Sequence, residues 1–245
     1  MNTPWDVAVV GAGAAGASAA FHLANAGRRV LLLDQARFPR SKPCGGGMAA
    51  SVQRLFPFDL RPAVDQVIER VRFTWCLEDP VIAELPGDAP FWIVRRSRLD
   101  AFLAEQAVAA GAEFRQGVAV TALERGADGL WQLPDGSQAR AVVIADGSGS
   151  CLAGPLGLGP ARPRFADTVS VEVACEPAEP STARFEFGLV RHGFCWAFPR
   201  EGGFSIGVGT FIGREPADAD AVLRQLLPSL GLGADAGERR AGRLR

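Results

Sequence analysis

Short apolar runs alternate with glycine-rich turns at the start of the chain. Residues 6–10 (DVAVV) and 29–33 (RVLLL) have the length and apolar content of buried strands. The alanine-rich stretch 14–26 between them has the length of a helix, and Gly27 ends it. Strand, helix and strand within about 30 residues predict a parallel βαβ unit.

The middle of the chain continues this mixture of helices and strands. A loop dense in proline and glycine covers 38–47, and a helix is expected from there to about Phe56. We predict strands at 71–77, 91–95, 113–123, 130–133 and 138–145, and a helix at 97–110 with Ser97 as its N-cap. Pro134-Asp135-Gly136 is typical of a hairpin turn between two of these strands.

Beyond residue 160 the pattern becomes that of a sheet. Extended segments are expected at 168–174, 183–189, 194–198 and 204–209, and a helix at 218–230. Charged and aromatic residues alternate strictly in Arg184-Phe185-Glu186-Phe187, which places both phenylalanines on one face of a strand. We expect a mostly antiparallel sheet that covers a ligand cavity.

Composition narrows the class of protein. The 245 residues are 48% hydrophobic with a net charge of −1 and no basic stripe, which argues against a nucleic-acid partner. The five cysteines form no CxxC pair, so neither a metal site nor a disulfide framework is expected. No run of 18 apolar residues suggests a membrane span. These features indicate a globular protein of a reducing, cytoplasmic setting.

The turn after the first strand carries the first chemical signal. Gly11-Ala12-Gly13-Ala14-Ala15-Gly16 is a GxGxxG motif between a strand and a helix, and Asp34 lies 23 residues after its first glycine. Gly11 permits the turn, Gly13 lets a pyrophosphate approach the backbone, and Gly16 lets the helix pack closely. The helix N-terminus would then bind the phosphates and Asp34 the ribose hydroxyls. The motif alone leaves FAD and NAD as alternatives.

Three further segments favour FAD over NAD, because they resemble segments of a known family of FAD-dependent enzymes. Residues 39–47 (PRSKPCGGG) resemble the PxxKxCGG loop of the geranylgeranyl reductase family of FAD-dependent oxidoreductases, which shares its fold with p-hydroxybenzoate hydroxylase and flavin-dependent halogenases. Residues 96–100 (RSRLD) resemble the family's RxxxD helix start, and residues 142–150 (VVIADGSGS) its ADGxxS segment. The resemblance implies FAD contacts by Ala15, Cys44, Gly45, Gly47, Arg96, Asp146, Gly147 and the backbone of Val120.

A fourth segment is similar to the reductases' YxWxFP…GxG signature. Here it reads Phe194-Cys195-Trp196-Ala197-Phe198-Pro199 followed by Gly207-Val208-Gly209, with Phe194 in place of the tyrosine and Arg200 in place of a lysine. The resemblance implies that Phe194, Trp196 and Phe198 line a hydrocarbon-binding tunnel. The lost tyrosine hydroxyl removes a hydrogen-bond donor but leaves the aromatic surface.

The resemblance implies an α/β fold with a Rossmann-like FAD-binding domain, at 1–70 plus 96–160, and a β-sheet substrate domain at 71–95 plus 161–245. The family usually continues past a GDAAG segment that is not evident here. Gly233-Ala234-Asp235-Ala236-Gly237 lacks the preceding buried strand, so we expect a substrate domain truncated at its C-terminus.

The implied activity is hydride transfer from reduced FAD to a carbon–carbon double bond of a prenyl chain. NAD(P)H or ferredoxin would supply the electrons, and a prenyl lipid substrate would make peripheral membrane contact plausible. The alternatives are a monooxygenase or halogenase of the same fold and a non-catalytic flavin-binding remnant. The sequence does not indicate the substrate's identity or the oligomeric state.

Few side chains offer acid–base or redox chemistry. By resemblance, Cys44 lies near the flavin and modulates its redox behaviour. Cys195 faces the opposite side of its strand from Phe194 and Trp196, which favours a core position. His22 lies near the end of a helix and His192 in a turn, so a solvated or structural role is expected for both.

Overall fold

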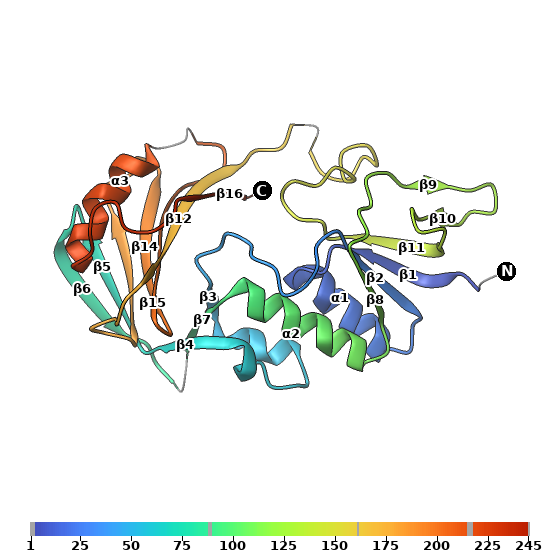
Figure 1. Cartoon of the computed structure of the whole chain (residues 1–245), viewed down its shortest axis with the longest axis horizontal. Coiled ribbons are helices and arrows are strands. Elements are labelled where there is room, and N and C mark those ends of the chain that lie inside the picture. The colour runs from blue at the N-terminus through green and yellow to red at the C-terminus, as the bar shows by residue number, and fades with distance from the viewer. Residues whose placement is uncertain (1–2, 88–89, 161, 215–217, 245) are drawn as a thin grey trace. The chain divides into compact units, whose positions relative to one another are not determined.

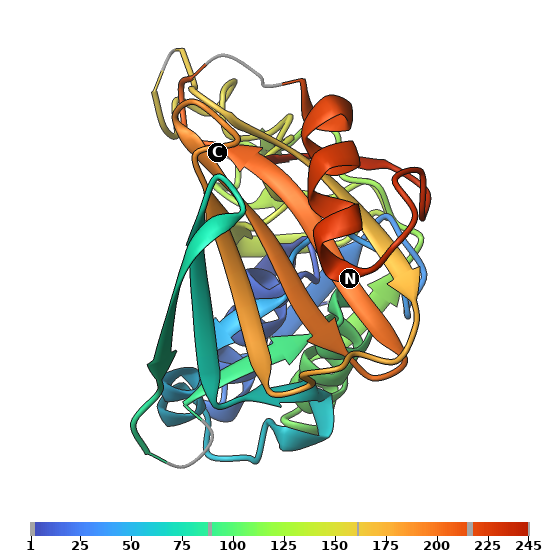
Figure 2. The ribbon, with the colours of Figure 1, turned by 90° about the vertical axis from the view of Figure 1, so that its left-hand side faces the viewer.

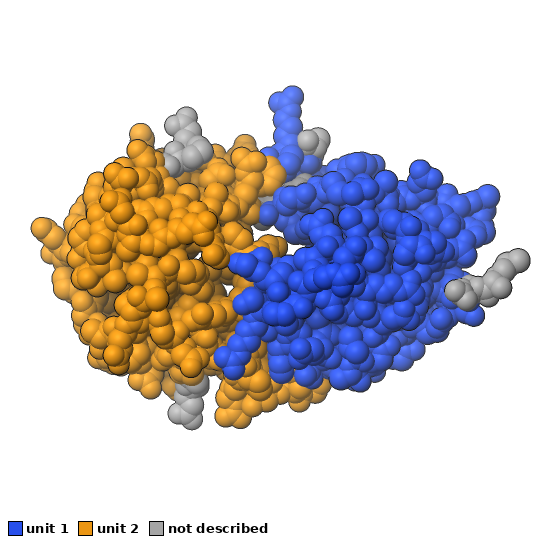
Figure 3. Space-filling model, in the orientation of Figure 1, with its two compact units in different colours: residues 1–41, 97–163 blue, residues 42–96, 164–245 orange. Residues whose placement is uncertain are grey.

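The computed structural model describes residues 3–87, 90–160, 162–214 and 218–244. The chain forms two compact units, each assembled from two separated segments (Figures 1 and 3). Unit 1 comprises residues 1–41 and 97–163, and unit 2 comprises residues 42–96 and 164–245. This division differs from the expected one because residues 42–70 belong to unit 2.

Unit 1 is built on a six-stranded sheet with the order β8-β2-β1-β11-β10-β9. Its parallel strands are β8 (Glu113–Gln116), β2 (Val30–Asp34), β1 (Trp5–Val10) and β11 (Gln138–Ile144), and the short β10 (Trp131–Gln132) and β9 (Glu124–Arg125) continue it in antiparallel fashion. Every residue of β2 is buried, as expected for a parallel strand covered on both faces.

Two helices accompany this sheet. Helix α1 (Ala14–Asn25) joins β1 to β2 and packs against both strands, which confirms the predicted βαβ unit. Helix α2 (Arg96–Ala109) begins one residue before the expected start, so Ser97 lies in its first turn and is not its N-cap. The hairpin at Pro134-Asp135-Gly136 is present, and Gly136 adopts a φ of +80° there.

Unit 2 contains a seven-stranded sheet with the order β16-β12-β15-β14-β13-β5-β6. The strands are β16 (Arg240–Leu244), β12 (Ala166–Ala174), β15 (Gly203–Thr210), β14 (Gly193–Arg200), β13 (Thr182–Phe187), β5 (Arg70–Trp75) and β6 (Glu78–Glu84). All neighbours pair antiparallel except β13 and β5, which are parallel. The expected antiparallel sheet is therefore largely present, while β6 and β16 were not predicted.

A smaller sheet explains why residues 42–70 belong to unit 2. Strand β7 (Phe91–Val94) pairs antiparallel with both β3 (Gly47–Ala49) and β4 (Val64–Ile68). The helix expected up to Phe56 is a short 3-10 helix, η1 (Ala50–Leu55), and a second one, η2 (Arg61–Ala63), precedes β4. The pairing of β3 and β4 with β7 ties this segment to the second unit, and local sequence pattern does not reveal it.

The two faces of the seven-stranded sheet differ in character. Helix α3 (Ala219–Leu226), capped by the Asp218 side chain, and the 3-10 helix η3 (Leu227–Leu230) cover one face, over buried residues such as Cys195 and Ile206 (Figure 2). The other face carries Phe185, Phe194, Trp196 and Phe198. Strict alternation along β14 produces this division.

No helix in the described part of the chain is both long enough and apolar enough to cross a membrane.

Candidate cofactor site and aromatic face

The glycine turn after β1 leaves no room for side chains. Gly11 has a φ of +96°, and a Cβ atom there would lie 2.4 Å from the carbonyl oxygen of Ala145. A Cβ atom on Gly16 would lie 1.7 Å from the carbonyl oxygen of Gly11. Both neighbours are backbone atoms, so larger residues at these positions would force the main chain apart.

The start of α1 is open to a ligand. Gly13 is its N-cap in an extended conformation, no side chain caps the helix, and its first turn carries no acidic residue. The first N–H groups of a helix have no partner within the helix and attract anions. Gly13 and the exposed Ala15 therefore stand where a phosphate group would bind.

Asp34 fastens the glycine turn to the end of β2. One carboxylate oxygen accepts a hydrogen bond from the Ala12 N–H at 2.8 Å, and the other accepts one from the Ala36 N–H at 2.8 Å. Only 7% of Asp34 is exposed. A carboxylate offers about four acceptor positions, so two bonds to the backbone leave capacity for a ribose hydroxyl. The sequence did not reveal this structural role.

Arg40 is a partner of Asp34 that the sequence pattern did not single out. Its guanidinium lies 3.1 Å from the fully buried Asp100 carboxylate and 4.0 Å from that of Asp34. The ring of Phe38 stacks against it at 4.9 Å. Asp100 of the RxxxD segment thus pairs with Arg40, while Arg96 opens the helix and is half-buried.

The remaining predicted contacts of unit 1 lie at the same edge of its sheet. Val10 pairs with Ile144, so the glycine turn and the segment from Ala145 to Gly147 leave neighbouring parallel strands together. Gly147 has a φ of +92°. The side chain of Val120 is buried in the core, which leaves only its backbone for a ligand. In open α/β sheets, ligands bind at the carboxyl ends of the strands, where these residues lie.

In unit 2, the loop around Cys44 lies directly on strands β7 and β14. A Cβ atom on Gly45 would lie 3.0 Å from the Trp196 Nε1, and one on Gly47 would lie 2.7 Å from the Phe91 ring. Gly46 has a φ of +86°, and a Cβ atom there would lie 2.2 Å from the Val94 carbonyl oxygen. Close packing therefore leaves no room for a side chain at Gly46 and little room at Gly45 and Gly47.

The spacing of the WxF and GxG segments follows from the register of β14 and β15. Trp196 is paired with Gly207, and a Cβ atom on Gly207 would lie 2.1 Å from the indole ring. A Cβ atom on Gly209, the next glycine on that face, would lie 3.7 Å from the same ring. Trp196 therefore lies across β15, between Gly207 beneath it and Gly45 above it.

The rings of this face form a continuous row, but they differ in exposure. Trp196 and Phe198 are only 7% and 5% exposed, whereas Phe194 is half-buried. Phe194 contacts Phe185, Phe187, Trp196 and Phe211 at ring-centroid distances of 5.9–6.3 Å. The predicted alternation of Phe185 and Phe187 is confirmed, since Phe73 stacks on both.

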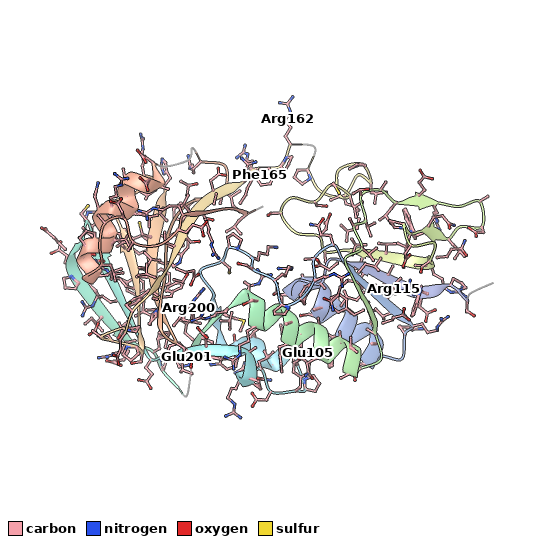
Figure 4. All side chains as sticks on the ribbon, in the orientation of Figure 1. Glu105, Arg115, Arg162, Phe165, Arg200 and Glu201 are labelled. Atoms are coloured by element: carbon pink, nitrogen blue, oxygen red, sulfur yellow. The ribbon has the colours of Figure 1, made fainter. Side chains whose placement is uncertain are left out.

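Arg200 is a second residue whose contacts the sequence did not predict. It ends β14 (Figure 4), is 6% exposed, and its Nη2 donates to the carbonyl oxygens of Cys44 and Gly45, both at 3.2 Å. Its Nη1 lies 2.6 Å from a carboxylate oxygen of Glu172 on β12. The family's lysine is thus replaced by a side chain that binds three oxygens.

The cysteines and histidines lie in different environments. Cys195 is fully buried on the α3 face, as predicted, and burial together with the nearby Glu186 charge raises the pKa of its thiol to about 12. Cys44 is half-buried. His22 and His192 are both exposed, and His192 lies in a turn with a φ of +59°, so the solvated roles expected for them are confirmed.

The family model for FAD-dependent oxidoreductases matches residues 6–73 and 88–242. The chain belongs to this family. The glycine cradle and the uncapped helix of unit 1 fit the diphosphate of FAD, and the predicted α/β fold class is confirmed.

Curated relatives support the predicted resemblance to geranylgeranyl reductases. Digeranylgeranylglycerophospholipid reductase 2 of Methanothermobacter thermautotrophicus is 32% identical over 225 residues, which cover 84% of this chain and 57% of that protein. Menaquinone reductase of Mycolicibacterium smegmatis is 33% identical over 255 residues, covering 93% and 60%. The chain thus spans somewhat less than two thirds of these relatives.

Solved structures share the fold. A geranylgeranyl bacteriochlorophyll reductase-like protein from Thermoplasma acidophilum aligns with a TM-score of 0.83 at 21% identity, covering 98% of this chain and 66% of that one. Halogenase PltM, in complex with phloroglucinol and FAD, aligns with a TM-score of 0.74 at 20% identity, covering 98% and 60%. At these identities, the likeness establishes the architecture only.

Proposed function

We propose that this protein is an FAD-dependent reductase of carbon–carbon double bonds in the prenyl chain of a lipid. The observation that carries the proposal is the aromatic row of unit 2, in which half-buried Phe194 connects buried Trp196 to the exposed Phe211. An apolar, polarisable surface of this kind suits an isoprenoid chain better than a charged substrate. The names of the two curated relatives denote a reductase of digeranylgeranylglycerophospholipid and a reductase of menaquinone.

In this proposal, unit 1 holds the cofactor. Gly11, Gly13 and Ala15 would receive the diphosphate at the start of α1, and Asp34 the adenosine ribose. The backbone of Val120 would contact the adenine. Asp146 and Gly147, at the adjacent strand end, would approach the flavin side of the cofactor. When bound, reduced FAD supplies a hydride.

The other proposed contact residues, which rest on the family resemblance, lie in unit 2. Cys44, Gly45 and Gly47 of the loop and Arg96 are proposed FAD contacts, and Phe194, Trp196 and Phe198 are proposed substrate contacts. Trp196 and Phe198 are covered by the loop glycines, so the half-buried Phe194 is the residue best placed to contact a chain. NAD(P)H or ferredoxin remains the proposed electron source.

Anaerobic turnover tests this function. We expect purified protein to be yellow, to release FAD on denaturation and, after reduction with dithionite, to add two hydrogen atoms per double bond to a digeranylgeranylglycerophospholipid. Mass spectrometry of the extracted lipid measures the product. Phe194→Ala should raise the KM about tenfold, equivalent to about 1.4 kcal/mol of lost apolar contact. Phe58→Ala, which removes a ring that contacts Phe56 in the loop between η1 and η2, is the matched control.

Two outcomes would contradict the proposal. Oxygen-dependent consumption of NAD(P)H without any saturated lipid would indicate a monooxygenase or halogenase of the same fold. Colourless protein that cannot be reconstituted with FAD would indicate a non-catalytic chain.

A further inference from the structure

One end of the seven-stranded sheet of unit 2, which we call the Trp75 end, has features that the proposed function does not use. Trp75 at the end of β5 pairs with Phe187 at the end of β13. Gly193, at the start of β14, pairs with Thr210 at the end of β15. The rings of Phe187 and Phe194 lie 6.1 Å apart and connect these two pairs. The ends of β5, β13 and β15 and the start of β14 therefore lie side by side (Figure 2).

Large apolar side chains are exposed at the Trp75 end. Trp75 is 62% exposed, and Phe211 and Ile212, which follow β15, are 51% and 55% exposed. Leu244 of β16 is 56% exposed and pairs with Ala166, at the start of β12 beside the end of β15. Exposed apolar side chains that gather at one place mark a surface that contacts another molecule.

The turn that presents Trp75 is held in place by hydrogen bonds. The Cys76 N–H donates to the Phe187 carbonyl at 2.8 Å, and the Leu77 N–H donates to the carboxylate of the buried Glu186 at 2.9 Å. Cys76 and Leu77 adopt φ values of +51° and +69°, as the two central residues of a type I′ hairpin turn do. Trp75 therefore stands on an ordered hairpin, and its exposure is a property of the fold.

Three arginines flank the apolar residues that follow β15. Arg191 lies in the turn before β14, and Arg214 lies two residues after Ile212. The Arg164 side chain lies against Gly213, since a Cβ atom on this glycine would be 2.8 Å from the Arg164 Cδ. All three arginines are exposed, and none of them has an ion-pair partner among the described residues. Positive charges of this kind attract an anionic surface.

The acidic side chains of this region are engaged elsewhere or lie apart from the three arginines. The Asp167 carboxylate binds Arg243 at 3.1 Å, and Asp218 caps α3. Glu78 and Asp79 belong to β6, which is separated from β15 by β14, β13 and β5. The positive charge next to the end of β15 is therefore not neutralised by these groups.

The exposed apolar side chains follow a line rather than forming a compact patch. With about 4.8 Å between strands, Trp75 on β5 and Phe211 after β15 lie roughly 14 Å apart across the sheet, and Leu244 on β16 lies about 10 Å further along. A protein partner would need a compact apolar core. Separate side chains at strand ends can instead insert into the interface of a bilayer, where tryptophan is favoured and arginine reaches the phosphate groups.

We propose that the Trp75 end of unit 2 binds the surface of a membrane that contains anionic phospholipids. Its exposed apolar side chains insert between the lipids, and the three arginines bind lipid phosphates. Phe211 lies 6.2 Å from Phe194, so this surface is continuous with the residue proposed to contact the prenyl chain. The inference rests on the proposed function for its purpose, which is to bring the protein to a lipid substrate.

Co-sedimentation of the full chain with vesicles tests the inference. Vesicles of equal parts phosphatidylglycerol and phosphatidylcholine are compared with vesicles of phosphatidylcholine alone. The variants are Ile212→Gln, Arg214→Gln and Trp75→Phe. The matched controls are Ile82→Gln, at a 50% exposed isoleucine on the other face of the sheet, and Arg54→Gln, at an exposed arginine of η1.

The wild type should bind the anionic vesicles at least about tenfold more tightly than the neutral ones, because each arginine near an anionic surface adds to the affinity. Ile212→Gln should weaken binding about tenfold through lost apolar burial. Arg214→Gln should weaken it about fivefold, and only for the anionic vesicles. The two controls should bind as the wild type does.

Quenching of tryptophan fluorescence by brominated phosphatidylcholine locates the contact independently. Bound wild-type protein should be quenched, because Trp75 enters the lipid. Trp75→Phe keeps an aromatic ring and should still bind, but this quenching should disappear.

The inference is overturned if the wild type binds both kinds of vesicle equally, or if Ile212→Gln and Arg214→Gln bind as tightly as their controls. Quenching that persists in Trp75→Phe would also overturn it. The substituted side chains are exposed, so the variants should fold, and thermal unfolding verifies this. A dimer that Ile212→Gln disperses, without any binding to vesicles, would instead identify the surface as a contact between two copies of this chain.

Reduction of a prenyl lipid in detergent micelles tests the proposed function separately. Protein that binds anionic vesicles but reduces no lipid would contradict the proposed function alone. Protein that reduces the lipid in detergent but binds no vesicle would contradict the membrane surface alone. Ile212→Gln should leave the turnover in detergent unchanged, because no bilayer has to be reached there.

Discussion

Gly16 in unit 1 and Gly207 in unit 2 both leave room for a neighbour, but the neighbours differ in kind. A Cβ atom on Gly16 would lie 1.7 Å from a backbone oxygen, that of Gly11. A Cβ atom on Gly207 would lie 2.1 Å from a side chain, the Trp196 indole. The collision at Gly16 depends only on the backbone conformation of the turn. The collision at Gly207 depends on which side chain the paired residue of β14 carries.

This contrast explains the different character of the two sites. The cofactor cradle of unit 1 is made of main-chain groups within one βαβ unit. Its glycines, Gly11, Gly13 and Gly16, lie within six residues of the chain. The aromatic face of unit 2 is made of side chains brought together by strand register. We therefore expect the first type to tolerate no side chain at Gly11 or Gly16, and the second to tolerate compensating pairs of substitutions.

The largest effect is expected for the reactivity of two cysteines, the buried Cys195 of unit 2 and the exposed Cys151 of unit 1. At pH 8 a thiol with a pKa of about 12 is ionised in only about one molecule in ten thousand. Cys195 of unit 2 should therefore react with iodoacetamide at least about a thousandfold more slowly than the exposed Cys151 of unit 1. Peptide mass spectrometry of the folded chain measures both rates. Comparable rates would contradict the assigned burial of Cys195.

Gly16→Ala should weaken FAD binding by about a hundredfold or more, which corresponds to about 3 kcal/mol. The reason is that α1 must move away from β1 when a methyl group meets the Gly11 carbonyl. Flavin fluorescence titration measures the affinity. Gly154→Ala is the matched control in the same unit, because no atom lies within 4 Å of the added methyl group. Equal FAD affinities for Gly16→Ala and Gly154→Ala would contradict the proposal that the glycine turn binds FAD.

Gly207→Ala should lower the stability of the chain by about 1–3 kcal/mol through overpacking against Trp196. Thermal unfolding measures the change. The double variant Gly207→Ala/Trp196→Leu sharpens the comparison. The leucine leaves room for the methyl group added at Gly207, so the double variant should lose less stability than the sum of the losses in the two single variants. No such partner exists for Gly16→Ala, because the atom it meets is backbone. Additive effects in the pair would show that the indole is not the neighbour that matters.

The smallest effect concerns an ion pair in unit 1. Burial raises the pKa of Asp135, but the Ser137 N–H and the Arg115 guanidinium (Figure 4) lower it more, so its net pKa lies below the ordinary value. A lowered folded-state pKa stabilises the protein above the unfolded value of about 3.9, and this contribution is lost as the pH falls through the folded value.

Asp135→Asn should therefore cost about 0.5–1 kcal/mol at pH 7 and progressively less below about pH 4. Urea unfolding at pH 7 and below about pH 4 measures the free energy of unfolding of the variant and of the wild type. Asp235→Asn, at the more exposed pair with Arg224 in unit 2, should have little effect at either pH. A cost for Asp135→Asn that does not depend on pH would rule out the ion pair as its source.

The pattern of glycines and apolar runs predicted the βαβ unit, the hairpin at Asp135 and most strands of both sheets. These features depend on local rules, such as the period of a strand and the turn that only glycine allows. The helix expected up to Phe56 was wrong because pairing of β3 with β7 takes the start of that segment into a sheet. The weak edge strands β6 and β16 exist only as partners of β5 and β12.

The sequence by itself determined the phosphate turn, the acidic residue after β2 and the alternation that gives the sheet an aromatic face. Only the tertiary structure decided that Asp34 also binds the Ala12 N–H, that Arg40 pairs with Asp100, and that Arg200 holds the loop at Cys44. The physical reason is distance along the chain. Backbone motifs are closed by neighbours in sequence, whereas Arg200 and Cys44 are 156 residues apart and meet only because their strands do.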